Sequence, residues 1–227
     1  GAWVPDEWID LCFAAMAITE RHTHQVLTKR PERMKSYVTG LGCKAGYARL
    51  KTAAHRLGYA IRFFNDLLLV RWPIPSIWLG VSVEDQKRAD ERIPVLLQIP
   101  ATVRFLSCEP LLSECNISCI SGKIDWVIAG GESGGEARPM HPAWARSLRD
   151  QCQWAGVPFF FKQWGEWFPT EHDPRHWPES HKRWTFTEDG QQMARYGKKQ
   201  AGRLLDGREW NEFPDVTAIK PVGKLCR

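Results

Sequence analysis

Apolar and polar positions follow one another along the chain in a repeating order. Five short apolar runs, each followed at once by polar residues, predict five strands. The runs lie near residues 24–28, 77–81, 103–106, 126–129 and 159–161. The segments between them have apolar residues at helical spacing. The order strand, helix, strand indicates a parallel sheet, so the fold class is α/β.

The segments between the apolar runs predict where the helices begin and end. Proline at a first helical position and glycine after a last one mark several of these boundaries. We expect a helix over 5–18, a mostly helical stretch over 31–70 that breaks at 40–42, a helix over 84–92 capped by Ser82, a short helix that restarts at Pro94, and a helix from His141 to Gly156. The segment 111–123 lacks periodicity and is expected to be a loop.

The composition changes after Trp164, where Trp, Pro and His residues follow one another without a period. Two Asp-Gly pairs, at 189–190 and 206–207, lie between alternating runs and predict small hairpins. We therefore expect residues 1–165 to form a partial (β/α) barrel of parallel strands, similar to a TIM barrel. Residues 166–227 would be an aromatic and basic extension packed on that barrel.

The amino-acid composition excludes few classes of function. The 227 residues include 12 tryptophans, which could fill the core or stack on a planar ligand such as a base. The net charge of +5 favours phosphate-bearing partners weakly and also serves solubility. Seven cysteines without a disulfide-scaffold spacing, and no apolar stretch near the length of a membrane span, predict a cytoplasmic protein with free thiols.

Three carboxylates, Glu84, Glu109 and Glu132, follow three successive strands of the predicted sheet. In a parallel sheet these positions meet at one rim, where α/β proteins bind ligands. Lys29, Arg30 and Lys162 would stand on the same rim. Acids and bases together suit a metal-bound substrate or a zwitterionic cofactor. A structural network of ion pairs is the alternative.

A glycine-rich stretch over 130–135 also follows a strand. It matches neither the dinucleotide fingerprint nor the P-loop, but its backbone could approach an adenosine or similar group closely. Cys108, Cys115 and Cys119 lack the paired spacing of a zinc site. We therefore predict no metal site built from cysteine.

Several motifs together resemble a family of uncharacterised phage and prophage proteins that are regarded as radical-SAM-like. The motifs are Leu27-Thr28-Lys29-Arg30-Pro31, Trp78-Leu79-Gly80-Val81-Ser82-Val83-Glu84, Phe105-Leu106-Ser107-Cys108-Glu109-Pro110, Gly130-Gly131-Glu132-Ser133-Gly134 and Phe161-Lys162-Gln163-Trp164-Gly165. The resemblance runs from Pro5 to about Pro214. It implies a partial barrel that holds a 4Fe-4S iron–sulfur cluster and S-adenosylmethionine.

The resemblance also implies roles for rim residues. Those expected to bind the cofactor are Ser82, Glu84, Ser107, Gly130, Gly131 and Glu132, and those expected to act on the substrate are Lys29, Arg30, Glu109 and Lys162, with Gln163 beside them. The expected substrate is a nucleic acid or a nucleotide. Family members have a Cys-x-x-x-Cys-x-x-Cys segment ahead of this region, and no three cysteines of this chain repeat that spacing. We therefore expect that this chain is either a fragment or a form that keeps the fold without the radical chemistry.

Two other functions remain open from the sequence. One is a metal-dependent phosphoester hydrolase in which Glu84, Glu109 and Glu132 bind Mg²⁺ or Mn²⁺ and Lys162 steadies a phosphoryl group. The other is a non-catalytic module that binds nucleic acid through the basic tail, with an affinity that falls as salt is added.

Overall fold

The computed structural model describes residues 3–59, 72–120, 122–170 and 182–215. The chain forms two compact units. The first contains residues 1–81, 92–105 and 215–227, and the second contains residues 82–91 and 106–214. The expected division at residue 165 stays a sequence prediction.

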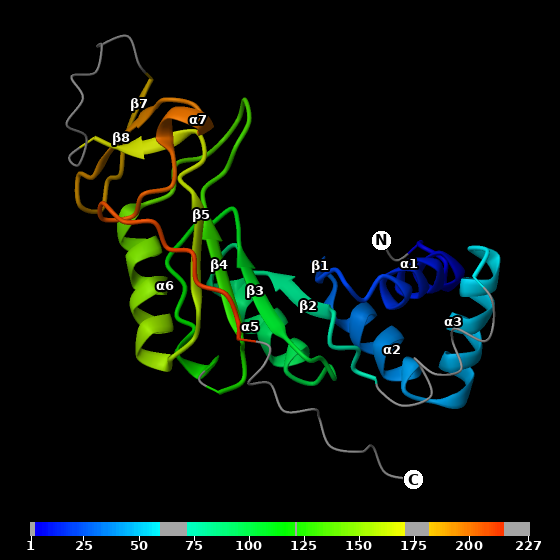
Figure 1. Cartoon of the computed structure of the whole chain (residues 1–227). Coiled ribbons are helices and arrows are strands. Elements are labelled where there is room, and N and C mark those ends of the chain that lie inside the picture. Colours follow the sequence, from blue (N-terminus) through cyan, green and yellow to red (C-terminus); the bar gives the residue numbers. More distant parts are fainter. Residues whose placement is uncertain (1–2, 60–71, 121, 171–181, 216–227) are drawn as a thin grey trace. The chain divides into compact units, whose positions relative to one another are not determined.

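A five-stranded parallel sheet confirms the α/β class (Figure 1). Its strands are β1 (His24–Thr28), β2 (Ile77–Ser82), β3 (Arg104–Cys108), β4 (Trp126–Gly130) and β5 (Phe159–Gln163). They lie in the order β1-β2-β3-β4-β5, which is also their order in the chain. This consecutive order is that of a barrel-like sheet, since a doubly wound sheet reverses direction at a switch point.

Three helices of the first unit pack through a buried polar link. They are α1 (Asp6–Ile18), α2 (Pro31–Leu41) and α3 (Lys44–Arg56), so the expected break at 40–42 is confirmed. A Cβ on Gly46 would lie 2.1 Å from the Gly40 carbonyl oxygen, so this tight corner requires glycine. The Tyr37 hydroxyl donates a 2.6 Å hydrogen bond to Asp10, which Arg49 also approaches. Most of the remaining expected helix lies outside the described residues.

One helix replaces the two that we expected between β2 and β3. Helix α5 (Gln86–Leu96) contains Pro94 in its interior, so the predicted restart at that proline is wrong. Proline lacks the amide that would donate to the carbonyl four residues earlier, and the helix continues for only two residues beyond it. The cap is Asp85 rather than Ser82, because the Asp85 carboxylate accepts a 2.9 Å hydrogen bond from the Arg88 amide.

Helix α6 (Pro142–Ala155) joins β4 to β5 and lies along the sheet in Figure 1. It begins and ends as expected. Nδ1 of His141 accepts a hydrogen bond from the Ala143 amide, and Gly156 ends the helix with φ 65°. Ala145, Leu148 and Cys152 are fully buried, and together they form the apolar stripe of the helix. The expected loop before β4 contains a short 3-10 turn, η1 (Ser118–Ile120).

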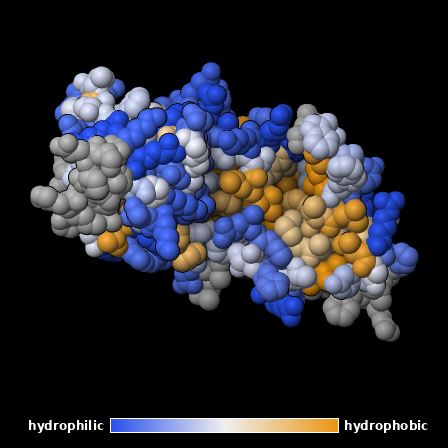
Figure 2. Space-filling model, turned by 90° about the horizontal axis from the view of Figure 1, so that it is seen from above, coloured by the Kyte–Doolittle hydropathy of each residue, from blue (hydrophilic) through white to orange (hydrophobic). Residues whose placement is uncertain are grey.

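The C-terminal part of the second unit is a small antiparallel sheet with the order β6-β8-β7. Its strands are β6 (Trp167–Pro169), β7 (Arg183–Thr185) and β8 (Gln192–Arg195), and α7 (Lys198–Ala201) follows. Both expected Asp-Gly turns are present, the second as a bridge between Leu205 and Arg208. The surface over this sheet is mostly hydrophilic in the left part of Figure 2.

Strand β5, at the edge of the parallel sheet, is covered by a C-terminal segment. The amide of Phe161 in β5 donates to the Trp210 carbonyl, and the Glu212 amide donates to the Phe159 carbonyl. This segment therefore runs beside β5, as Figure 1 shows. Across the described ranges, no helix is both long and apolar enough to cross a membrane.

Candidate functional site

Glu109 and Lys162 meet at the carboxyl rim of the parallel sheet. Glu109 follows β3, and Lys162 lies in β5. The Lys162 ammonium is 2.9 Å from Oε2 of Glu109, and the amide Nε2 of Gln163 donates to Oε1 at 3.1 Å. Strand β4 lies between β3 and β5, and it ends there in Gly130. A Cβ on Gly130 would lie 3.4 Å from Oε1 of Glu109, which is an ordinary contact distance, so Gly130 lies directly beside the pair.

Gln163 links the end of β5 to the glycine-rich loop after β4. Its side chain is buried, and Nε2 also lies 3.1 Å from the Ser133 hydroxyl and 3.3 Å from the Gly131 carbonyl oxygen. Several acceptors thus surround one amide group, which fixes its orientation. The fixed amide in turn holds one oxygen of Glu109 in place.

The glycines at 131 and 165 are explained by close backbone packing. A Cβ on Gly131 would lie 1.9 Å from the Trp164 carbonyl oxygen, and one on Gly165 would lie 2.1 Å from the Glu132 carbonyl oxygen. Gly165 also has φ 82°, which favours glycine. The close approach at Gly131 is therefore made by the protein's own chain. A cofactor contact by Gly130 or Gly131 stays a prediction.

Glu132 forms an ion pair with Arg138 that closes the loop between them. Its two carboxylate oxygens lie 2.8 and 2.9 Å from the Arg138 guanidinium, and the Arg138 amide donates a further hydrogen bond. These hydrogen bonds from Arg138 hold the pKa of Glu132 below its ordinary value. For this residue, the structure supports the ion-pair alternative that we considered.

Three further rim residues predicted to bind the cofactor are buried in the second unit or at its boundary. Ser82, Glu84 and Ser107 are each less than 8 % exposed. Their backbones join neighbouring segments, because the Val83 amide donates to the Ser107 carbonyl and the Leu112 amide donates to the Glu84 carbonyl. They lie at the ends of β2 and β3, as expected.

Lys29 and Arg30 belong to the first unit, directly after β1. Lys29 and Arg30 are both exposed, and the Arg30 amide donates a 3.0 Å hydrogen bond to the Thr28 hydroxyl. The cluster around Glu109 is built from residues of the second unit alone.

The three glutamates do not come together as a metal-binding group. Across the part of the chain that the structure describes, no three His, Cys, Asp or Glu side chains are arranged to hold a metal ion. Glu109 forms an ion pair with Lys162, and Glu132 forms one with Arg138. The ligand set that we expected for a metal-dependent hydrolase is therefore not formed by the described side chains.

The described cysteines also do not fit an iron–sulfur cluster, whose ligands are thiolates. Cys108, Cys115 and Cys152 are buried, and burial raises the pKa of Cys108 well above its ordinary value and that of the other two to about 12. These thiols therefore stay protonated near neutral pH. Cys12 and Cys43 are exposed in the first unit.

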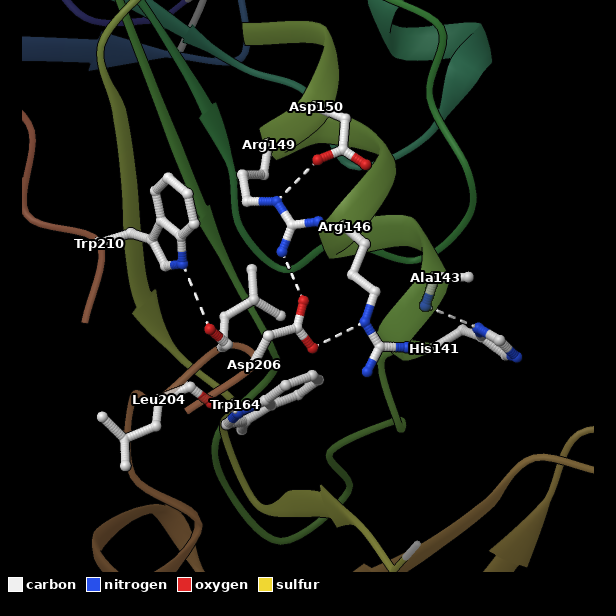
Figure 3. Close-up of polar contacts among 10 residues, drawn as sticks. His141, Ala143, Arg146, Arg149, Asp150, Trp164, Leu204, Asp206 and Trp210 are labelled. Carbon is white, nitrogen blue, oxygen red and sulfur yellow. Dashed lines mark hydrogen bonds and ion pairs between the residues drawn. The ribbon is translucent and has the colours of Figure 1, made fainter. Parts of the chain in front are cut away.

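A clamp on the C-terminal segment positions the end of β5, and the sequence patterns did not reveal it. Asp206 lies in the tight turn with φ 54°, and its carboxylate accepts hydrogen bonds from Arg146 and Arg149 of α6 (Figure 3). Burial would raise the pKa of Asp206, but the hydrogen bonds from the two arginines outweigh burial and lower it. The Trp164 indole donates to the Leu204 carbonyl at 2.8 Å. The clamp therefore holds Trp164, which follows Gln163 directly.

Much of the tryptophan content is structural. Trp126, Trp164, Trp167 and Trp210 are buried, and each indole N–H donates to a backbone carbonyl. These side chains fill the core of the second unit and connect its segments. Trp154 and Trp184 of the same unit are 81 % and 48 % exposed.

The fold and the site define an α/β protein with a singly wound parallel sheet and a charged, hydrogen-bonded cluster at its carboxyl rim. A family model described as "Protein of unknown function (DUF5131)" matches residues 2–214, and the chain belongs to this family. The search of curated proteins found no match, and neither did the search of solved structures.

Proposed function

We propose that the rim cluster of Glu109, Lys162 and Gln163 binds a small zwitterionic ligand of the S-adenosylmethionine class. The supporting observation is the 2.9 Å pair of Lys162 and Glu109 at the carboxyl ends of parallel strands. An amino-acid group bears one ammonium and one carboxylate. Its two charges complement those of the pair, and half of the Lys162 side chain is exposed to receive it.

Each residue of the cluster has a separate task in this proposal. The Glu109 carboxylate accepts from the ligand ammonium, and the Lys162 ammonium donates to the ligand carboxylate. Gln163 holds Oε1 of Glu109 before the ligand arrives, and Ser133 and Gly131 hold Gln163. A carboxylate fixed in advance loses little conformational freedom on binding.

The remaining predicted residues complete the proposed site. Ser82, Glu84 and Ser107 would line it, and Gly130 would keep the space beside Glu109 free of a side chain. When bound, S-adenosylmethionine supplies a carbon activated by the neighbouring sulfonium. The proposed substrate is a nucleic acid or a nucleotide. A reducing compartment such as the cytoplasm suits the free thiols.

Calorimetric titration of S-adenosylmethionine into the full chain tests the proposal. Glu109→Gln and Lys162→Met should each weaken binding by roughly tenfold or more, since each removes a charge-assisted hydrogen bond. Lys123→Met is the matched control, because this exposed lysine precedes β4 at the opposite end of the strand. Absence of binding by the unaltered protein, or equal affinities for all variants, would refute the proposal.

A further inference from the structure

Four cations of the C-terminal part have no ion-pair partner within the described ranges. Lys182 and Arg183 lie at the start of β7, and Lys198 and Lys199 begin α7; all four are exposed. Between residues 182 and 208 the sequence has seven Lys and Arg against three Asp and Glu. This segment therefore has a local excess of positive charge.

Two of the three acids in this segment are already engaged elsewhere. Asp189 lies 3.0 Å from Nε2 of His141, and Asp206 is held by Arg146 and Arg149. Both acids therefore contact residues outside the segment. The lysines of α7 and the cations of β7 remain available to an anionic partner.

Trp184 follows Lys182 and Arg183 directly in the chain, and 48 % of its surface is exposed. Its ring centroid is 6.5 Å from that of Phe186, whose own ring lies 4.6 Å from His141 at the start of α6. The backbone around Trp184 is fixed, because the residue pairs with Met193 of β8. An indole held in place and partly exposed beside cations is suited to stack on a planar group.

We propose that β7 and α7 form a binding surface for single-stranded nucleic acid. Lys182, Arg183, Lys198 and Lys199 contact phosphates, and Trp184 stacks on one base. The nucleic acid must be single-stranded, because in a duplex the faces of the bases stack on one another and are not accessible to an indole ring. This surface is distinct from the cluster at Glu109, and the inference does not depend on what that cluster binds.

An anionic lipid surface would also attract these cations, but the structure favours nucleic acid. Helices that lie on membranes present a long apolar face, whereas α7 has four residues. In segment 182–208 the exposed large hydrophobic residues are Trp184 and Leu204. The surface over the antiparallel sheet and α7 is accordingly mostly hydrophilic in Figure 2. Little apolar area is available for insertion into lipid.

The charge contacts are tested by fluorescence anisotropy with labelled dT12 and rU12 at several KCl concentrations, using the full chain. For four phosphate contacts, the plot of log affinity against log salt should have a slope of roughly −3. Lys198→Gln together with Lys199→Gln should reduce the size of that slope by about 1.4. Lys123→Gln is the matched control and should leave it unchanged. Binding that does not respond to salt would overturn the inference.

The stacking contact is tested with two exposed tryptophans of the same unit. Trp184→Ala should weaken oligonucleotide binding about fivefold or more, and Trp184→Phe should keep most of the affinity. Trp154→Ala should have no effect, although Trp154 is the more exposed residue. Thermal unfolding of each variant shows whether it is folded. Equal losses in Trp154→Ala and Trp184→Ala, or binding to phosphatidylserine vesicles without binding to either oligonucleotide, would overturn the inference.

Discussion

The Lys162 ammonium lies 2.9 Å from the Glu109 carboxylate although 53 residues separate them in the chain. The two residues reach one another over the end of β4, the strand between theirs. Two strands that flank a third one lie roughly 9–10 Å apart, so a bulky side chain at the end of β4 would lie between Glu109 and Lys162. Gly130 occupies that position.

The pair should contribute little to stability. Half of the Lys162 side chain is exposed, so solvent screens its attraction to Glu109. Lys162→Met should change the free energy of unfolding by about 1 kcal/mol or less, as measured by urea denaturation. Lys123→Met provides the reference for loss of an exposed lysine. A loss of several kcal/mol from Lys162→Met alone would show that the pair is structural.

Gly131 should be intolerant of any side chain. In Gly131→Ala, the new Cβ would lie 1.9 Å from the Trp164 carbonyl oxygen, so the ends of β4 and β5 must move apart. We expect a loss of about 2–3 kcal/mol in urea denaturation, as for overpacking elsewhere. Gly135→Ala in the same loop is the control, because nothing lies within 4 Å of its added Cβ. Similar stability of the two variants would contradict this packing.

The sequence predicted the strands of the parallel sheet well because each contains a short apolar run that is followed by polar residues. It also predicted α6, where His141, Pro142 and Gly156 mark the boundaries. The prediction for the helix before β3 was wrong at Pro94, which lies inside α5 rather than at the start of a new helix. A proline's effect depends on how many hydrogen bonds the rest of the helix retains, and a local pattern does not show that number.

The site was predictable only in part. Positions after parallel strands meet at one rim, so Glu109, Lys162 and Gln163 could be grouped from the sequence. The sequence could not predict which acid pairs with which base, because the pairing depends on the direction of the side chains. Glu132 forms its ion pair with Arg138 and not with a base of the Glu109 cluster. The clamp by Asp206 was missed because its partners lie about 60 residues away on α6; the only local signal was the Asp-Gly turn.

Asp206 should stabilise the C-terminal segment in a pH-dependent way. Its pKa in the folded protein is lowered, so its stabilising contribution is present above the pKa of the unfolded state, about 3.9, and is lost as the pH falls through the folded value. Asp206→Asn keeps a residue that tolerates φ 54° but removes the charge. At pH 7 we expect a loss of about 1 kcal/mol, since the group is partly exposed.

Unfolding by urea between pH 7 and pH 3 measures this contribution. The difference between the unaltered protein and Asp206→Asn should shrink as the solution is acidified. Asp150→Asn is the control, because Asp150 is 65 % exposed and pairs with Arg149 alone among the ion pairs of the described residues. A difference that is constant over the whole range would mean that the carboxylate charge of Asp206 is not what stabilises the turn.

The five cysteines whose surroundings the structure describes should divide into two classes of reactivity. Hydrogen bonds from the Gly46 and Ala45 amides lower the pKa of Cys43, so this exposed thiol has more thiolate at pH 7 than an ordinary cysteine. Burial raises the pKa of Cys108, Cys115 and Cys152. In N-ethylmaleimide labelling mapped by mass spectrometry, Cys43 should react first and Cys12 later. Labelling of Cys108 in the native protein before that of Cys43 would contradict the burial of Cys108.

The central claim is that the rim recognises the paired charges of an amino-acid group. The most direct measurement compares the affinities of S-adenosylmethionine and 5′-methylthioadenosine, which keeps the nucleoside and lacks the ammonium and the carboxylate. We predict that calorimetry will show binding of S-adenosylmethionine and at least a roughly tenfold weaker affinity for 5′-methylthioadenosine, with the difference lost in Glu109→Gln together with Lys162→Met. Equal affinities of the unaltered protein for the two ligands would contradict the account.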